Sequence, residues 1–157
     1  MTATLQDNRL VKTFADLRSA GRKALMPFLT AGYPTLEATA ALLADFESRG
    51  VRIVELGVPF SDPIGDGTTI QLAAGRALRH GTTPRDCLAV VRAVRRRSQA
   101  PVALMGYLNP ILAADPATFF PEAAEAGVDA LIIPDLLPEE AGDLGALPAH
   151  RARRRAV

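Results

Sequence analysis

The strongest candidate for chemistry is an acidic residue inside an apolar segment. Glu55 interrupts the apolar run 51–56 close to its C-terminal end. A carboxylate in apolar surroundings costs free energy to desolvate, and its pKa tends to rise, which suits proton transfer. The structural alternative is an ion pair between Glu55 and Arg52 or another neighbouring residue.

The loop that follows this segment adds two more carboxylates. Residues 57–67 contain three glycines, two prolines and two aspartates. Glycine and proline together hold a tight backbone path, so we expect Asp62 and Asp66 to reach the same cavity as Glu55. Two carboxylates in different surroundings can then divide an acid role and a stabilising role. Because Gly67 follows it, Asp66 fits a simple turn equally well.

Five further residues follow or end apolar segments and are expected at one rim of a sheet. They are Phe28, Thr30, Tyr107, Asn109 and Asp135. Tyr107 can donate a hydrogen bond to a substrate or can be an amphipathic rim residue. Asp135 fits a loop cap or a substrate contact, and Phe28 fits the core or a pocket lining.

The remaining reactive residue types do not form a recognisable site. His80 and His150 lie far apart and have no cysteine or histidine at metal-ligand spacing, so no metal site is expected. Cys87 lies inside an expected helix and is interpreted as a small buried hydrophobic residue. Neither the glycine-rich dinucleotide motif nor the phosphate-cradling Gly-x-x-x-x-Gly-Lys motif occurs, so the sequence gives no support to a site of either kind.

The elements that must position these residues alternate along the chain. Strands are expected at 24–30, 51–56, 101–106 and 129–134, and helices at 12–23, 36–48, 70–78, 84–97, 116–126 and after Pro138. Thr83 is expected to cap the helix that begins at Pro84. The strand segments are continuously apolar, which favours a parallel sheet covered on both faces. A doubly wound open sheet fits the length but lacks its dinucleotide motif.

Composition excludes several classes of protein. The 157 residues are 48% hydrophobic and 22% charged, with a formal net charge of +1, so neither a membrane bundle nor a polyelectrolyte partner is indicated. The single cysteine and the absence of a signal-like apolar segment predict a cytoplasmic location. Four arginines fall in the last seven residues, which predicts a solvated basic tail.

Four ordered blocks of sequence resemble the tryptophan synthase alpha subunit family over about residues 10–144. They are PFLTAGYP at 27–34, ELGVPFSDPIGDG at 55–67, LMGYLNPI at 104–111 and AGVDALIIPDL at 126–136. The resemblance implies an α/β fold of the TIM (β/α)₈ barrel family. It also implies retro-aldol cleavage of indole-3-glycerol phosphate to indole and glyceraldehyde 3-phosphate, without a metal or an organic cofactor.

The resemblance assigns roles to individual residues. Glu55 matches the general acid and base, and Asp66 matches the carboxylate that holds the indole N–H and stabilises positive charge on the ring. Phe28 and Tyr107 match residues that line the indole pocket. The loop from Pro59 through Asp62, together with Asp135, matches an interface with the pyridoxal-phosphate beta subunit, in an assembly of two alpha and two beta chains.

The chain departs from this family in two places. Gly65 stands where alanine is commoner, which should loosen the loop. A complete barrel takes about 250 residues, so we expect only the N-terminal half here, with about four βα units in a partial barrel domain at 1–144. Residues 145–157 are expected to be an aberrant, disordered basic tail of the kind a reading-frame shift produces. Cleavage is therefore expected to be impaired, and the alternative is a noncatalytic fragment that binds the beta subunit.

Overall fold

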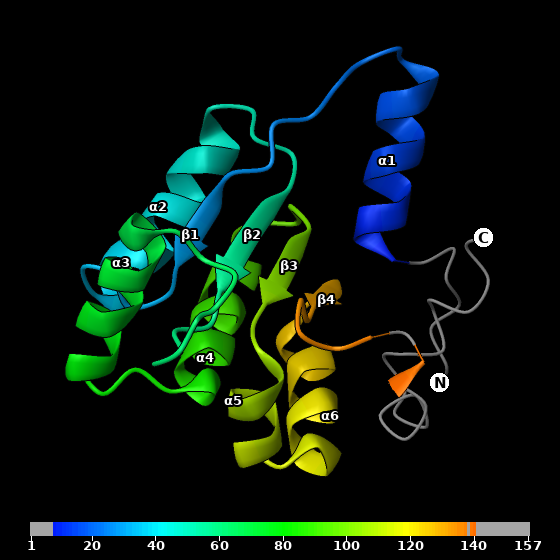
Figure 1. Ribbon diagram of the computed structural model, residues 1–157. Helices are drawn as coiled ribbons and strands as arrows, with labels where there is room; N and C mark the ends of the chain where they lie inside the picture. The colour runs from blue at the N-terminus through cyan, green and yellow to red at the C-terminus, as the bar shows by residue number, and fades with distance from the viewer. Residues whose placement is uncertain (1–7, 138, 141–157) are drawn as a thin grey trace.

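The computed structural model describes residues 8–137, 139 and 140 (Figure 1). The strands are β1 Phe28–Thr30, β2 Val54–Gly57, β3 Val102–Met105 and β4 Ala130–Ile132. The helices are α1 Arg9–Ser19, α2 Leu36–Ser48, α3 Thr68–Arg79, α4 Pro84–Arg95, α5 Leu108–Ala113 and α6 Pro116–Ala126. Within this part of the chain, none of the helices has the length and apolar character needed to cross a bilayer.

The four strands form one parallel sheet in chain order, β1-β2-β3-β4. Every neighbouring pair is parallel, and a helical crossover connects each strand to the next. Doubly wound sheets reverse their strand order at a switch point, whereas barrels keep it consecutive. The order therefore excludes the doubly wound alternative and agrees with part of a barrel.

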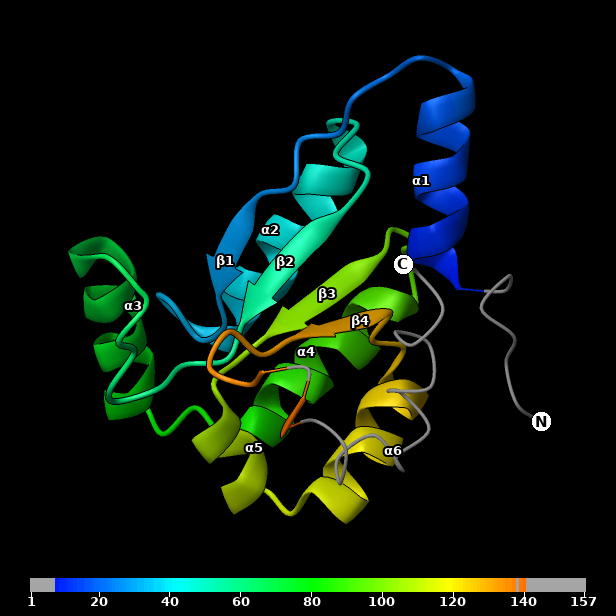
Figure 2. The same cartoon turned by 45° about the vertical axis from the view of Figure 1, so that its right-hand side comes forward.

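One face of the sheet forms the core. Val54 and Leu56 of β2 and Val102 and Leu104 of β3 are buried there with residues of α2, α4 and α6. These three helices pack side by side on the same side of the sheet (Figure 2). The sequence predicted a sheet covered by helices on both faces. That prediction is wrong for the described residues, because none of the helices in this part of the chain covers the face opposite α2, α4 and α6 (Figure 2). A continuously apolar strand sequence is compatible with a face covered by helices and with a face that points into a barrel, because both kinds of face exclude water.

Most elements form where the sequence predicts them. Helices α2 and α6 have the expected bounds, and the strands are shorter than expected by two to four residues. Thr83 caps α4 as predicted: its side chain accepts from the backbone N–H of Asp86, whose carboxylate accepts from the N–H of Thr83. Helix α5 was not predicted. The helix expected after Pro138 and the basic segment 145–157 lie outside the described residues, apart from Glu139 and Glu140.

A largely buried ion cluster ties α1 to the N-terminal ends of β3 and β4. The Asp129 side chain is only 3% exposed and lies just before β4. Its Oδ2 is 2.6 Å from Arg95 Nη2 and accepts from the Val102 N–H at 2.8 Å. Its Oδ1 is 2.9 Å from Arg9 Nε. One carboxylate therefore joins α1, α4, β3 and β4.

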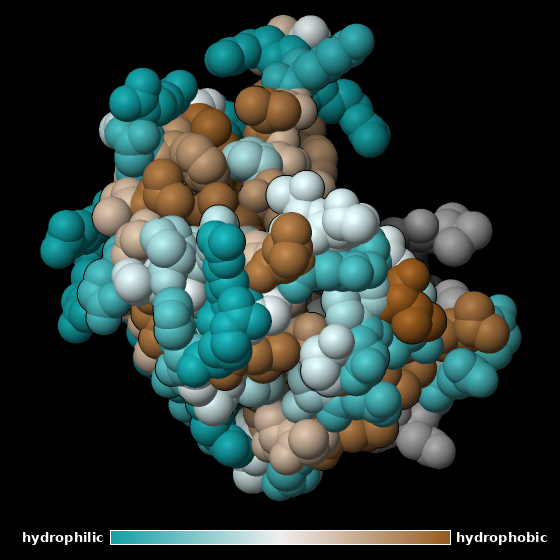
Figure 3. Space-filling view, turned by 60° about the vertical axis from the view of Figure 1, so that its left-hand side comes forward, coloured by the Kyte–Doolittle hydropathy of each residue, from teal (hydrophilic) through white to brown (hydrophobic). Residues whose placement is uncertain are grey.

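The surface is mixed in character. Figure 3 shows one face, on which apolar patches alternate with hydrophilic side chains. Several large apolar side chains are exposed, and the most exposed are Ile64 at 87%, Leu25 at 75% and Leu72 at 67%. Ile64 lies in the loop that leads from β2 to α3, close in sequence to Asp66.

Candidate functional site

Glu55 and Phe28 lie side by side on the sheet face that α2, α4 and α6 do not cover. The strand register aligns Phe28, Glu55, Ala103 and Ala130 across β1 to β4. Partners in register on parallel strands point to the same face, so two alanines extend the row beyond Glu55 and leave room in front of its carboxylate. The Phe28 ring lies against the Cα of Gly57, where an added Cβ would overlap the ring.

The environment of Glu55 favours its protonated form. Burial raises the pKa of its carboxyl group, and the negative charge of Asp66 raises that pKa further. The alternative of an ion pair with Arg52 is wrong, because Arg52 is exposed and no ion pair found among the described residues includes Glu55. A half-buried carboxyl with a raised pKa can donate a proton at a higher pH than a free glutamic acid.

Asp66 lies in a turn, the simple structural role that the sequence also allowed for it, and this turn brings it near Glu55. Its backbone N–H donates to the Pro63 carbonyl at 3.1 Å, and its own carbonyl accepts from Gln71 Nε2 at 2.9 Å. These bonds fix the backbone on both sides of a half-buried side chain. The turn and the electrostatic effect on Glu55 are therefore compatible.

Tyr107 is the N-cap residue of α5, and it lies beneath the loop that contains Asp66. Its side chain is only 3% exposed, and its hydroxyl oxygen accepts from the Gly65 N–H at 2.9 Å. Its ring packs against Phe60, with 5.3 Å between the centroids. Burial raises the pKa of the Tyr107 phenol, and the charges of Asp66 and Asp135 act in the same direction. Tyr107 is thus part of the site's packed interior rather than an amphipathic rim residue.

Asp135 acts as a cap, which was one of its two predicted roles. Its side chain Oδ1 accepts from the Leu108 N–H at 2.9 Å, at the first residue of α5. A carboxylate stabilises a helix N-terminus because the first N–H groups have no partner within the helix. Asp135 is itself exposed, so this bond leaves most of the residue open to solvent.

A groove lies beside this site, between the start of the loop and α5. It has a volume of about 690 Å³. It is lined by Pro59, Phe60, Ser61, Leu78, Thr82, Thr83, Pro84, Arg85, Asn109, Pro110, Ala113 and Ala114. Asp62 is exposed next to this lining and accepts from the Ser61 hydroxyl at 2.6 Å. Two predicted interface residues, Pro59 and Asp62, therefore occur together at the groove, whereas Asp135 does not line it.

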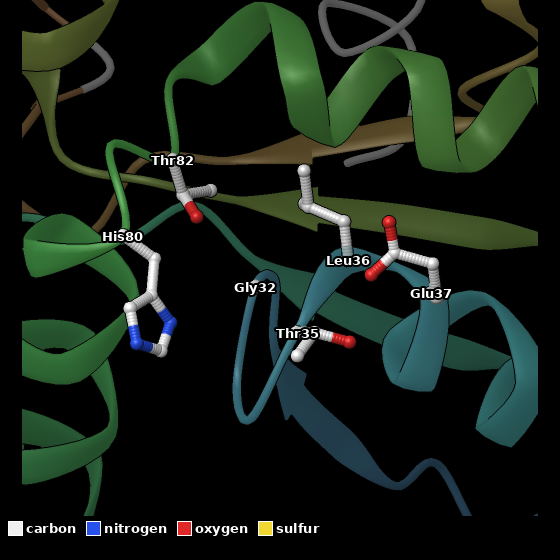
Figure 4. Close-up of a pocket in the computed structure, with 6 residues that line it drawn as sticks. All are labelled: Gly32, Thr35, Leu36, Glu37, His80 and Thr82. Atoms are coloured by element: carbon white, nitrogen blue, oxygen red, sulfur yellow. The ribbon is translucent and has the colours of Figure 1, made fainter.

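A second cavity of about 370 Å³ contains no predicted site residue (Figure 4). It is lined by Gly32, Thr35, Leu36, Glu37, His80 and Thr82. His80 is exposed, and no group of three or more potential metal ligands occurs in the part of the chain that the structure describes. Cys87 is fully buried, and burial raises the pKa of its thiol to about 12, in keeping with its predicted role as a packing residue.

Sequence reasoning missed two contacts of the site. Phe60 packs on Tyr107, and the Leu108 amide binds Asp135. Phe60 lies inside the loop from Pro59 through Asp62 that the resemblance assigned to an interface, but nothing in that loop's sequence indicates the contact with Tyr107. The Leu108 contact spans 27 residues and requires α5, so no local pattern predicts it.

Comparisons with known proteins identify the family. The family model of the tryptophan synthase alpha chain matches residues 14–151, and so extends past residue 144, where the resemblance was expected to stop. The chain is 50% identical over 139 residues to the tryptophan synthase alpha chain of Geotalea daltonii and 52% identical over 139 residues to that of Geobacter sulfurreducens. Both alignments cover 88% of this chain and 53% of the relative, so the chain spans about half the length of the curated relatives it matches.

Solved structures agree with this result. The tryptophan synthase alpha subunit of Legionella pneumophila superposes with a TM-score of 0.86 at 42% identity, over 89% of this chain and 54% of that one. A chain of tryptophan synthase from M. tuberculosis gives 0.85 at 38% identity, over 93% and 59%. The fold expected from the sequence, part of a TIM barrel, is confirmed. By fold and by sequence, this chain belongs to the tryptophan synthase alpha chain family.

Proposed function

We propose that the chain carries the acid–base half of a site that cleaves indole-3-glycerol phosphate to indole and glyceraldehyde 3-phosphate. Glu55 is the general acid and base, and Asp66 is the electrostatic partner. The observation that carries this proposal is the setting of Glu55: a half-buried carboxyl with a raised pKa, on the second residue of β2 and within the influence of a second carboxylate.

The two proton transfers of this reaction balance on a single carboxyl group. The Glu55 acid donates its proton to indole C3, which moves positive charge onto the ring nitrogen. The resulting Glu55 carboxylate then takes the proton of the glycerol hydroxyl next to the breaking bond. The electron pair of the C–C bond returns to the ring, indole leaves, and the hydroxyl carbon becomes the aldehyde of glyceraldehyde 3-phosphate.

Asp66 and the aromatic residues complete the proposed site. The Asp66 carboxylate accepts the indole N–H and stabilises the positive charge that develops after protonation of C3. Phe28 packs beside Glu55 and Tyr107 packs below the loop, so both are available to line an indole pocket. The small side chains of Ala103 and Ala130 leave space on the sheet for a flat ring.

The groove beside the loop is proposed as the contact with the tryptophan synthase beta subunit. Pro59 lines the groove and Asp62 is bonded to the lining residue Ser61, and the lining is predominantly formed by apolar atoms. Asp135 is proposed to act near this interface through α5, whose N-terminus it caps.

The proposal includes a cytoplasmic location, where the free Cys87 stays reduced.

The alternative proposal is a noncatalytic chain that binds the beta subunit. The groove favours it independently of Glu55, because none of the groove's lining residues is Glu55 or Asp66. Substrate positioning depends on contacts with groups remote from the reacting bond, so a chain with about half the length of its relatives can keep a binding surface while losing turnover.

The deciding experiment is cleavage of indole-3-glycerol phosphate by the purified chain, with and without added beta subunit. Indole release that is lost in Glu55→Gln supports the catalytic proposal. Binding of the beta subunit without turnover supports the alternative. An Asp62→Lys variant is compared with Asp45→Lys, which changes an exposed aspartate on α2. The interface proposal fails if both variants bind the beta subunit like the unchanged chain.

A further inference from the structure

The Tyr107 hydroxyl lies where the loop from β2 to α3 meets α5. Its oxygen accepts from the Gly65 N–H at 2.9 Å, and Gly65 is the residue immediately before Asp66. The Tyr107 ring is held by burial and by Phe60. A phenol can accept one hydrogen bond and still donate its own proton. We propose that Tyr107 is the positioning residue for Asp66: its oxygen holds the loop at Gly65, and its proton is available to the Asp66 carboxylate.

The fit around Gly65 supports this assignment. A Cβ added at Gly65 would lie 3.1 Å from the Tyr107 hydroxyl oxygen, which is tighter than ordinary van der Waals contact. The absence of a side chain therefore lets the loop approach the phenol closely in this chain. An alanine at this position would push the hydroxyl and the loop apart by a few tenths of an ångström.

The electrostatics of the site connect Tyr107 to Glu55 through Asp66. Asp66 raises the pKa of the Tyr107 phenol by its charge and by hydrogen bonding, and it also raises the pKa of Glu55 by its charge. Asp135 is the other carboxylate that acts on the phenol. If Tyr107 fixes Asp66, removing the Tyr107 hydroxyl makes Asp66 raise the pKa of Glu55 by less. Tyr107 and Glu55 share no hydrogen bond among those found in the described residues, so the change must act through Asp66.

The test is the titration of Glu55, followed by NMR of its side-chain carboxyl carbon in the whole chain without substrate. Asp66→Asn should move the Glu55 midpoint to lower pH. Tyr107→Phe, which keeps the ring, should move it in the same direction by a smaller amount. The double variant should match Asp66→Asn alone, because two residues that act through one path are not additive. Gly65→Ala should give a smaller shift of the same sign.

Tyr33→Phe is the matched control, since Tyr33 is the only other tyrosine and its hydroxyl contacts Arg76 rather than the loop. It should leave the Glu55 midpoint unchanged. Hydrogen exchange at Gly65 gives a second readout: loss of one hydrogen bond in Tyr107→Phe should quicken exchange of that amide by about two- to tenfold, and Tyr33→Phe should not. Gly65→Ala keeps the test available if Tyr107→Phe does not fold.

The proposal is overturned if Tyr107→Phe leaves the midpoint unmoved while Asp66→Asn lowers it, or if the two shifts add in the double variant. It is also overturned if Asp66→Asn does not move the midpoint. The assignment rests on the roles proposed for Glu55 and Asp66, but its test needs no substrate. A chain that fails to release indole therefore refutes the proposed function without deciding the role of Tyr107.

Discussion

Replacing Asp129 by alanine should strongly destabilise the fold. The change leaves Arg95, whose side chain is only 11% exposed, without its carboxylate and removes the acceptor of the Val102 N–H. Breaking a buried ion pair costs about 3–5 kcal/mol. Arg95 keeps bonds to the carbonyls of Ala100 at 2.6 Å and Gly127 at 2.9 Å, so we expect the lower end, about 3 kcal/mol.

The assay is urea unfolding followed by far-ultraviolet circular dichroism, because the chain has no tryptophan. The matched control is Asp45→Ala, which removes an ion pair with Arg49 whose side chains are 48% and 73% exposed. It should cost less than about 0.5 kcal/mol. Asp129→Asn, which keeps an oxygen for Val102, should fall between the two. The reasoning is refuted if Asp129→Ala and Asp45→Ala lower the free energy of unfolding equally.

Four other predictions follow from the site and its supports. The free energy of unfolding of the chain, measured relative to Glu55→Gln, should fall as pH rises from the unfolded-state pKa of Glu55 through its raised folded-state pKa. The reason is that the folded chain binds this proton more tightly than the unfolded chain does, and urea unfolding at several pH values measures the difference. Cys87 should react with iodoacetamide only when the chain unfolds, because its thiol is buried with a pKa of about 12, and mass spectrometry with and without urea tests this. Gly57→Ala should displace the Phe28 ring and cost about 1–3 kcal/mol in urea unfolding. Thr83→Ala should remove the cap of α4 and cost about 1 kcal/mol; no loss in thermal or urea unfolding would contradict that role.

Local patterns predicted the elements that depend on local signals. Helix α4 begins where a capping threonine precedes a proline, and α6 ends at Gly127, which adopts the left-handed conformation that glycine favours. The placement of Glu55 within a strand also followed from its apolar neighbours, but it is the second residue of β2 and does not lie near the end, because the strand runs from Val54 to Gly57. In each case the physical cause lies within a few residues of the feature.

Features that depend on distant contacts could not be predicted in this way. Helix α5 has six residues with Pro110 inside it, so helix propensity alone would not support it. Asp135 stabilises its first amide across 27 residues. The contact between Tyr107 and Gly65 spans 42 residues and depends on how the loop folds back over β3. The roles predicted for the site residues from family resemblance stay predictions until they are tested.

The ion cluster at Asp129 also has a consequence for the order of folding. Asn8 donates to the Asp129 carbonyl across 121 residues, and Arg9 donates to the Gly127 carbonyl across 118. Closing so long a loop costs more chain entropy than pairing adjacent βα units. Asp129 is itself oriented by Val102 at the start of β3, so its acceptor sites exist only after β3 and β4 have met. We therefore expect helix α1 to dock only after β3 and β4 have paired, and to detach before that pairing is lost.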